Sequence, residues 1–435
     1  MTALAPPARV TAWFDRWGSI TPLLLAEFIV WVGFGALLPV LPIYFSEQGV
    51  DLATLGLVIA AWPAARLISE PVFGWLADRT ARVPLMVVGL IATGIVSVLP
   101  LFVVGAVPFI VLRAASGLST AIYDPAARGY LTDATAADRR GEAFGLLSAA
   151  QMGGLLFGPA IGAFGVTAFG GFSFVFLFSG LALLLAAIPI GLFLAETPVR
   201  TGHGPVPEAT EFPREDPAVA RRAASPDREG QDPVPFFRPT RILNRAIAAA
   251  VVLNAAGYFA GGTYEVIWSL YLQRLGAGLD LIGLTFATFG LPILILGPAA
   301  GRQVDRRGIL PFIVVGLAMP AMAGIYYTLI VDPRLALVGI LLESFGFALL
   351  NPALFALVAA GSPPGRSSTT QGLFGAAGTV GFIVASLVAG ILFSANANYP
   401  FYVFTTVSLV SLAIGLAIGW PILRAWRVVP ASGEA

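Results

Sequence analysis

The sequence predicts an all-α integral membrane protein with twelve transmembrane helices in two six-helix, pseudo-symmetric halves. The first observation is composition, because 57% of the 435 residues are hydrophobic and only 11% are charged. A soluble domain carries about 25% charged residues, so this chain has more apolar surface than one soluble core can bury. The other two observations are a set of twelve long apolar runs and an internal repeat that relates the two ends of the chain.

The twelve apolar runs are each long enough to cross a bilayer as a helix, which takes about 20 mainly apolar residues. Several runs contain Gly and Pro, which membrane helices tolerate because neighbouring helices satisfy the freed backbone groups. The predicted spans are 22–45, 53–77, 83–105, 107–131, 142–166, 171–195, 246–272, 281–303, 309–331, 335–359, 368–394 and 399–423.

The arginines predict the orientation of these spans, because cytoplasmic loops carry the excess of basic residues. Arginines cluster before span 1, after spans 2, 4, 8, 10 and 12, and between spans 6 and 7. The alternate loops hold only Arg274 and Arg334. Both termini are therefore expected to be cytoplasmic, in a multi-pass protein of the cell inner (plasma) membrane.

One long polar segment divides the chain. Residues 196–243 mix Pro, Glu, Asp and Arg without apolar periodicity, which is typical of a flexible linker. We therefore expect an N-terminal six-helix half at 1–195, a cytoplasmic linker at 196–243 and a C-terminal six-helix half at 244–435.

The internal repeat relates the two halves at a constant offset of 227 positions. It pairs Asp78-Arg79 with Asp305-Arg306, within the charged stretches GWLADRTAR and GRQVDRRGI. Parallel halves related by an axis along the membrane normal are one architecture of transporters, in which a site between the halves opens to each side in turn. Further pairs at this offset are Tyr44 with Tyr271, Gly49 with Gly276, Pro71 with Pro298, Pro125 with Pro352 and Arg139 with Arg366.

The charged stretch after span 2 resembles the loop motif of the major facilitator superfamily, although Ala81 and Val83 replace a usual Gly and a usual basic residue. An Asp at a helix end can accept bonds from the N-terminus of a neighbouring helix, which favours a conformational latch. The positive-inside rule alone would account for the arginines. The matching residues in the two halves are Gly74, Asp78, Arg79, Arg82, Gly301, Asp305 and Arg306.

Span 5 resembles the motif that marks the antiporter branch of the same superfamily. Glycines let a neighbouring helix approach closely, so plain helix packing also accounts for them. The antiporter interpretation adds that a kinked, tightly packed helix between the halves limits leak during rocking. The resemblance implies a twelve-span drug:proton antiporter that works as a monomer. The motif residues are Gly145, Gly154, Gly158, Pro159 and Gly162, with Ala163 where Gly is usual.

Ionisable side chains within the spans are the proton-coupling candidates, since charge is costly in a membrane and usually functional. Spans 1, 4, 7 and 10 line the central cavity in the superfamily, so Glu27, Glu265 and Glu343 are expected to face it. Arg113, the first residue of a stretch ending at Gly117 that resembles the span-4 motif of the superfamily, is expected opposite them. A carboxyl in a low-dielectric cavity can gain and lose a proton near neutral pH and exchange it for a cationic substrate. The alternative is a carboxyl that only fixes helix packing.

Two further sets of charges are interpreted as structural. Arg66 and Glu70 are four residues apart and share a helix face, so they can neutralise each other. Asp124 lies near Arg128 at the inner part of span 4 and is expected to pair there.

Aromatic side chains on the same helices are the candidates for substrate contact. Trp31 follows Glu27 by four residues and Trp268 follows Glu265 by three, so each shares a helix face with its acid. A lipophilic cation would stack on such rings, although packing in the core or against lipid also accounts for each of them. The substrate-cavity candidates are Trp31, Tyr123, Tyr258 and Trp268.

The sequence thus favours a secondary active transporter that exports small, lipophilic or cationic molecules in exchange for protons by alternating access. The alternative is a proton-coupled or facilitative transporter of a polar metabolite such as a sugar or siderophore, which the scarcity of Asn and Gln in the spans disfavours. The intact loop motifs argue against a sensor that has lost transport.

An enzyme is not expected, because the chain has no Cys and its one histidine, His203, lies in the linker. No cofactor, metal or nucleic-acid partner is expected. The expected partners are the lipid bilayer, the small-molecule substrate and protons.

Overall fold

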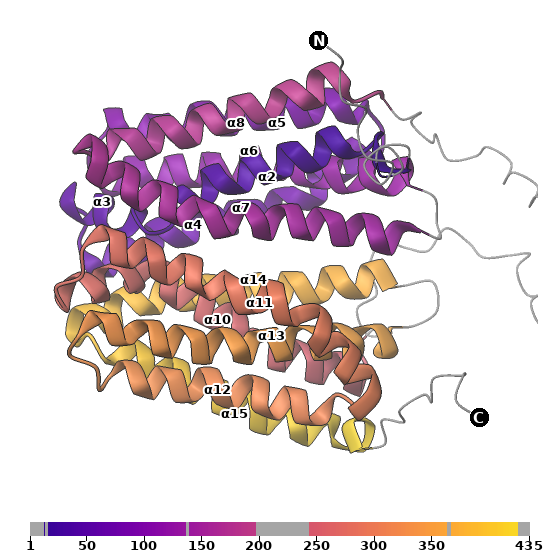
Figure 1. Cartoon of the computed structure of the whole chain (residues 1–435), viewed down its shortest axis with the longest axis vertical. Helices are drawn as coiled ribbons and strands as arrows, with labels where there is room; N and C mark the ends of the chain where they lie inside the picture. Colours follow the sequence, from indigo (N-terminus) through magenta and orange to yellow (C-terminus); the bar gives the residue numbers. More distant parts are fainter. Residues whose placement is uncertain (1–12, 14–15, 136–138, 197–242, 363–366, 425–435) are drawn as a thin grey trace, which may run out of the picture.

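The computed structural model describes residues 13, 16–135, 139–196, 243–362 and 367–424, in which all regular elements are helices (Figure 1). The first half contains α2 (Thr21–Leu37), α3 (Leu41–Glu47), α4 (Leu52–Ala77), α5 (Arg82–Val98), η1 (Leu99–Phe102), α6 (Ala106–Ala134), α7 (Arg140–Phe169) and α8 (Ser173–Phe193). The second half contains α10 (Arg245–Arg274), α11 (Leu279–Arg307), α12 (Leu310–Tyr327), η4 (Pro333–Leu335), α13 (Ala336–Gly361), α14 (Ser367–Ala395) and α15 (Tyr399–Arg424).

Eleven helical segments in the described residues are long and apolar enough to cross a membrane, and the bent pair α2–α3 supplies a twelfth. The all-α membrane fold with twelve spans is thereby confirmed. Most of the predicted linker at 196–243 lies outside the described residues, so the boundaries of the halves stay a prediction.

The first span, predicted at 22–45, is made of two helices, because α2 ends at Leu37 and α3 begins at Leu41 with a bend of 41°. Pro39 lies within this break, and Pro42 is the second residue of α3. Each proline lacks an N–H and clashes with the carbonyl four residues earlier, which makes the bend the local consequence of the sequence.

The repeat at offset 227 places the same turn in both halves. Gly49 and Gly276 both adopt a left-handed backbone, with φ of 85° and 87°, which glycine reaches without a Cβ penalty. We call the end of the bundle that carries these two turns the outer end. The opposite end, which carries Asp78 and Arg306, is called the inner end.

Two tyrosines at the outer end make the same hydrogen bond in the two halves. Tyr44 donates its hydroxyl to the carbonyl oxygen of Pro100 at 2.8 Å, and Tyr271 donates to the carbonyl oxygen of Tyr327. Donors and acceptors are both related by the offset of 227. The repeat therefore conserves a tertiary contact that ties each half's first span to the end of its third.

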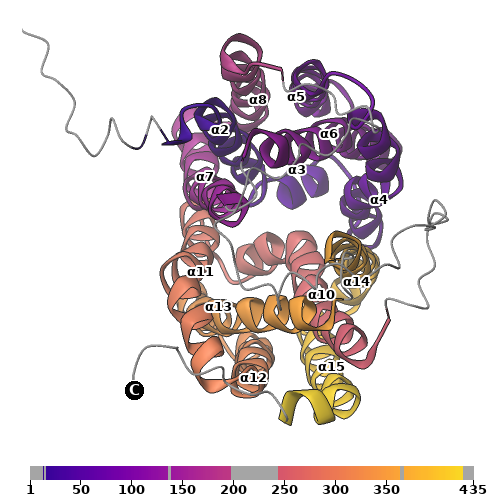
Figure 2. The same cartoon turned by 90° about the vertical axis from the view of Figure 1, so that its right-hand side faces the viewer.

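The two halves are joined mainly towards the outer end. One buried apolar cluster there combines Tyr44, Phe45 and Phe109 of the first half with Trp268 and Tyr271 of the second. Towards the inner end, the buried apolar residues form two separate clusters, one within each half. Figure 2 shows the halves side by side, with α4 next to α14 and α7 next to α11.

The α4–α14 and α7–α11 pairs make equivalent close contacts between the halves, and we call each of these contacts a joint. A Cβ on Gly56 of α4 would lie 2.1 Å from the carbonyl oxygen of Ser386 on α14. A Cβ on Gly283 of α11 would lie 2.9 Å from the carbonyl oxygen of Pro159 on α7. Both glycines and both partners are related by the offset of 227, so each joint depends on a residue without a side chain.

Replacing Gly56 with leucine should force the outer end of the α4–α14 joint apart. Relieving the 2.1 Å contact to a van der Waals distance of about 3.5 Å needs a shift of roughly 1.4 Å or more at the crossing. The chain has no native cysteine, so spin labels at Phe102→Cys and Val331→Cys report the separation of the halves by double electron–electron resonance. We expect the distance distribution to move to longer values.

Gly372→Leu is the matched control for this substitution. Gly372 also lies on α14, but no atom lies within 4 Å of a Cβ built there, so its distance distribution should match that of the parent chain. An unchanged distribution in Gly56→Leu would contradict the assignment of this contact as a joint.

Candidate functional site between the two halves

A buried ion pair links the two halves through α6 and α10. The Arg113 Nη2 atom lies 2.9 Å from Glu265 Oε1, and the two side chains are only 9% and 10% exposed. The same Nη2 lies 3.5 Å from the carbonyl oxygen of Ile59 on α4. The Arg113 Nε atom has no hydrogen-bond partner among the described residues. Separating such a pair without a replacement partner would leave two charges in a low-dielectric interior, which is strongly unfavourable.

The spacing of Arg113 and Gly117 explains how this guanidinium is positioned. The two residues are one helical turn apart and share a face of α6. A Cβ on Gly117 would lie 2.3 Å from the carbonyl oxygen of Trp62, so the glycine lets α4 cross α6 closely at Trp62. The Arg113 guanidinium then lies over the indole ring of Trp62, with its Cζ atom 5.7 Å from the ring centroid.

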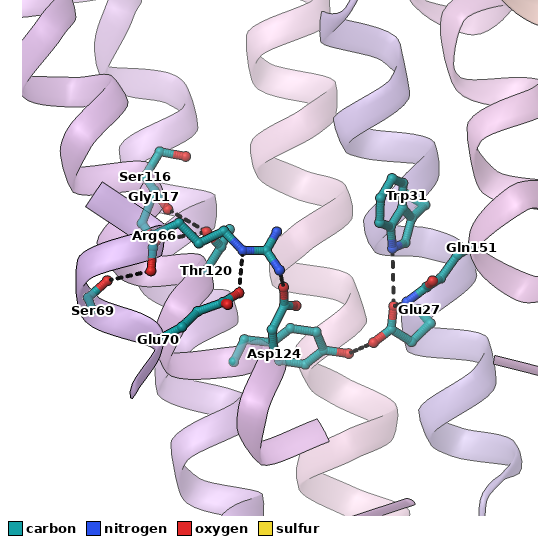
Figure 3. Close-up of polar contacts among 11 residues, drawn as sticks. Glu27, Trp31, Arg66, Ser69, Glu70, Ser116, Gly117, Thr120, Asp124 and Gln151 are labelled. Carbon is teal, nitrogen blue, oxygen red and sulfur yellow. Dashed lines mark hydrogen bonds and ion pairs between the residues drawn. The ribbon is translucent and has the colours of Figure 1, made fainter. Parts of the chain in front are cut away.

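A second charged cluster lies within the first half (Figure 3). Arg66 contacts Glu70 at 2.5 Å along α4, as the spacing of four predicted, and it also pairs with Asp124 of α6. Asp124 was expected to pair with Arg128, whereas in the structure it forms its ion pair with Arg66. The reason is that α4 packs along α6. This packing places Arg66 of α4 beside Asp124, a contact that spacing along one helix cannot predict. The cluster carries one positive and two negative groups.

Glu27 is buried within the first half, and its hydrogen-bonding partners in the described part of the chain include no guanidinium group (Figure 3). Its carboxyl accepts hydrogen bonds from Trp31 Nε1 at 3.2 Å, from the Tyr123 hydroxyl at 2.9 Å and from Gln151 Nε2 at 3.0 Å. These donors come from α2, α6 and α7. Glu27 therefore connects three helices through one carboxyl group.

Glu343 is fully buried within the second half. The Tyr327 hydroxyl donates to its Oε2 atom at 3.1 Å, and its Oε1 atom has no partner among the described residues. Of the four proton-coupling candidates, the structure therefore brings together Arg113 and Glu265. It places Glu27 in one half and Glu343 in the other, and their roles stay predictions.

The four substrate-cavity candidates occupy different environments. Tyr258 is 38% exposed and Trp31 is half-buried. Tyr123 and Trp268 are each only 2% exposed, so they pack in the interior and offer almost no accessible surface in this conformation. Trp268 donates to the Thr285 hydroxyl at 2.9 Å rather than to Glu265.

Sequence reasoning missed Phe34 as a site residue. Its ring lies 5.6 Å from that of Trp31 and 5.6 Å from that of Trp62, so it connects a substrate-cavity candidate to the residue beside Arg113. Its position three residues after Trp31 places both on one face of α2, and this spacing is the signal that would have found it.

The inner-end loop motif forms its contacts mostly within the first half. Arg82 pairs with Asp133 of α6 and lies 3.6 Å from Asp78, whose side chain is 75% exposed. The acid that caps a helix here is Glu196, which accepts from the backbone N–H groups of Arg82 and Val83 at 2.8 and 3.0 Å. The proposed latch role of Asp78 stays a prediction, and the side chain of Asp305 lies outside the described part of the chain.

Three glycines of the span-5 motif face α2 in the same half rather than the other half. Cβ atoms on Gly154, Gly158 and Gly162 would lie 2.1–2.6 Å from backbone carbonyl oxygens of α2. Gly145 has no atom within 4 Å of such a position. An adjacent face of α7 contacts α11, where Ala163 meets Gly283. The helix thus packs tightly against its own half while forming one joint with the other.

A membrane bundle of two repeat-related halves, with charged side chains buried between and within them, has the architecture of a secondary transporter. The sequence matches the Major Facilitator Superfamily over residues 23–272 and 247–432. The chain belongs to this superfamily, and it is a membrane transporter rather than an enzyme. As such it is a multi-pass protein that acts on a small-molecule substrate in a lipid bilayer.

The chain is similar along its length to two curated bacterial proteins. It is 27% identical over 418 residues to Multidrug resistance protein 1 of Bacillus subtilis (strain 168), covering 92% of this chain and 96% of that protein. It is 24% identical over 410 residues to Quinolone resistance protein NorA of Staphylococcus aureus (strain MRSA252), covering 89% and 93%.

Solved structures share the fold at lower identity. A bacterial homologue of the human lysosomal transporter Spinster, in an inward-facing and unoccupied conformation, superposes with a TM-score of 0.73 at 15% identity, covering 98% of this chain and 100% of that chain. The peptide transporter POT in complex with sulfate gives 0.71 at 17% identity, covering 93% and 95%.

Proposed function

We propose that the protein exports small, lipophilic or cationic molecules in exchange for protons by alternating access. The observation that carries the proposal is the buried Arg113–Glu265 pair between the halves. The names of the relatives, a multidrug and a quinolone resistance protein, support the class of substrate.

The Arg113–Glu265 ion pair can account for obligatory exchange of substrate for protons. With Glu265 ionised and no substrate bound, parting the halves would strand two buried charges, so the empty carrier stays closed at its outer end. A proton on Glu265, or a substrate cation beside it, neutralises the carboxylate. Glu265 then no longer requires Arg113 as its partner when the halves separate. Either ligand then permits the halves to rock, whereas the empty carrier does not.

The balance of buried charge favours a cationic substrate. Of the charged side chains within the predicted spans that are buried or half-buried, five are carboxyl groups and two are guanidinium groups: Glu27, Glu70, Asp124, Glu265 and Glu343 against Arg66 and Arg113. Opposite charges attract strongly in a medium of low dielectric constant. Glu27 and Glu343, which have no guanidinium partner of their own in the described contacts, are proposed as further proton-carrying groups.

Transport by proteoliposomes, with and without an imposed proton gradient, tests this function. We expect accumulation of a lipophilic cation such as tetraphenylphosphonium when the gradient is present, and loss of accumulation when an ionophore collapses it. A sugar supplied under the same conditions should not accumulate. Gradient-driven uptake of the sugar without the cation would instead support the alternative of a polar-metabolite transporter.

The arginine distribution supports an orientation with both termini in the cytoplasm. Membership of the superfamily supports a plasma-membrane protein that works as a monomer. Cysteines introduced singly at Asp78 and Phe102, in a chain that has none, can be labelled in intact cells. Labelling of the Phe102 position alone by a membrane-impermeant maleimide supports the orientation, and labelling of the Asp78 position alone refutes it.

A further inference from the structure

Trp62 is the residue at which the two charged clusters of the first half meet. The Cζ atom of Arg66 lies 5.3 Å from the centroid of its ring, and that of Arg113 lies 5.7 Å away. Arg66 belongs to the cluster with Glu70 and Asp124, and Arg113 belongs to the pair that joins the halves. One half-buried indole therefore lies beside two guanidinium groups with different carboxylate partners.

Two further rings, Phe34 and Trp31, lead from Trp62 towards Glu27. Trp62 lies 5.6 Å from Phe34, Phe34 lies 5.6 Å from Trp31, and Trp31 donates its indole N–H to Glu27. All three rings are half-buried, and none belongs to the fully buried apolar clusters. They form an aromatic surface that begins beside the inter-half ion pair and ends at a carboxyl group.

A ring of this kind attracts cations through its electron-rich face, and Trp does so best among the aromatic residues. The guanidinium groups of Arg66 and Arg113 already use that attraction. An aromatic cation that stacks on Trp62 must therefore compete with them, whereas a neutral molecule of the same shape gains less from the ring.

We propose that Trp62 selects aromatic cations and transmits their binding to the inter-half ion pair. The cation stacks on Trp62 and Phe34 and displaces the Arg113 guanidinium from the ring. Displacement weakens the contact of Arg113 with Glu265, so that substrate binding itself releases the outer end. Gly117 fixes the α4–α6 crossing that holds Trp62 and Arg113 together. The inference rests on the proposed function and names the residue that would give it substrate selectivity.

Two readouts on the purified full-length chain test this role. The first is the dissociation constant of tetraphenylphosphonium, and the second is the distance between spin labels at Phe102→Cys and Val331→Cys, which are 75% and 84% exposed at the outer end. In the parent chain the cation should lengthen this distance. Trp62→Leu should weaken binding about tenfold, and the distance should stay short even at saturating cation. Trp62→Phe, which keeps a ring, should lie between the two.

Trp75→Leu is the matched control, because the Arg79 guanidinium lies 4.2 Å from the Trp75 ring at the inner end, away from the ion pair. It should bind and respond like the parent chain. Parent-like binding and lengthening in Trp62→Leu, or an equal loss in Trp75→Leu, would overturn the proposal. Absence of binding to the parent chain would also overturn it. Binding with a Trp62-dependent distance change, but without proton exchange in vesicles, would support Trp62 and refute only the proposed coupling.

Discussion

Replacing Glu265 with glutamine is expected to abolish proton-driven transport and to open the outer end without substrate. The substitution removes the carboxylate that neutralises Arg113 across the two halves. An uncompensated buried charge costs about 3–5 kcal/mol, so the balance between closed and open outer ends should shift by more than about a hundredfold. Spin labels at Phe102→Cys and Val331→Cys measure that shift directly.

Two companion variants separate loss of charge from general damage. Glu142→Gln breaks the pair with Arg16, which is about half exposed and lies within the first half, and should leave the outer-end distance unchanged. The double variant Arg113→Gln/Glu265→Gln leaves no buried charge uncompensated but also lacks the ion pair, so its outer-end distance should lie between those of the parent chain and Glu265→Gln, while transport stays lost. An outer end that stays closed in Glu265→Gln alone would show that the ion pair does not hold the halves together.

Replacing Glu27 with glutamine should also abolish proton-coupled transport while leaving the protein folded. The amide oxygen can accept from Trp31 and Gln151, which both donate to Oε2 in the native site. The amide nitrogen can then donate to the Tyr123 hydroxyl, which is able to accept as well as donate. The packing is therefore satisfied, whereas the group can no longer bind and release a proton. Transport in vesicles with an imposed pH gradient should fall to the level of empty vesicles.

Glu27→Leu provides the contrasting variant. It leaves the donors of Trp31, Tyr123 and Gln151 without their acceptor in a buried site, which costs about 1–3 kcal/mol for each unsatisfied group. Its yield of folded protein in detergent should therefore fall, whereas that of Glu27→Gln should match the parent chain. Parent-like transport by Glu27→Gln would exclude Glu27 as a proton carrier.

The fold was predictable because both of its signals, the length of the apolar runs and the internal repeat, can be read directly along the sequence. Apolar run length gives the twelve spans, and the repeat at offset 227 gives two related halves. The repeat also relates details that were not predicted, such as the hydrogen bonds of Tyr44 and Tyr271 and the joints at Gly56 and Gly283. A sequence repeat indicates equivalent positions, but the contact partner of each position depends on how the helices pack.

The sequence predicted which charged residues lie within the spans, but it predicted only some of the ion pairs that they form. Helical spacing correctly predicts Arg66 with Glu70, because both lie on one helix. The pair of Arg113 with Glu265 joins residues 152 positions apart on helices of different halves, which spacing cannot reveal. The burial of Trp268 was not predicted for the same reason, because spacing along one helix does not show which other helix packs against the face that carries Glu265 and Trp268.

Substrate and protons are proposed to cross the membrane through one carrier in opposite directions. The most direct measurement is proton movement driven by substrate alone. Proteoliposomes are loaded with tetraphenylphosphonium and a pH-sensitive dye, and then diluted into cation-free buffer at equal internal and external pH, with the membrane potential clamped. Exit of the cation is predicted to acidify the interior in the parent chain and to leave it unchanged in Glu265→Gln. Exit of the cation without acidification, or with alkalinisation, would contradict proton exchange.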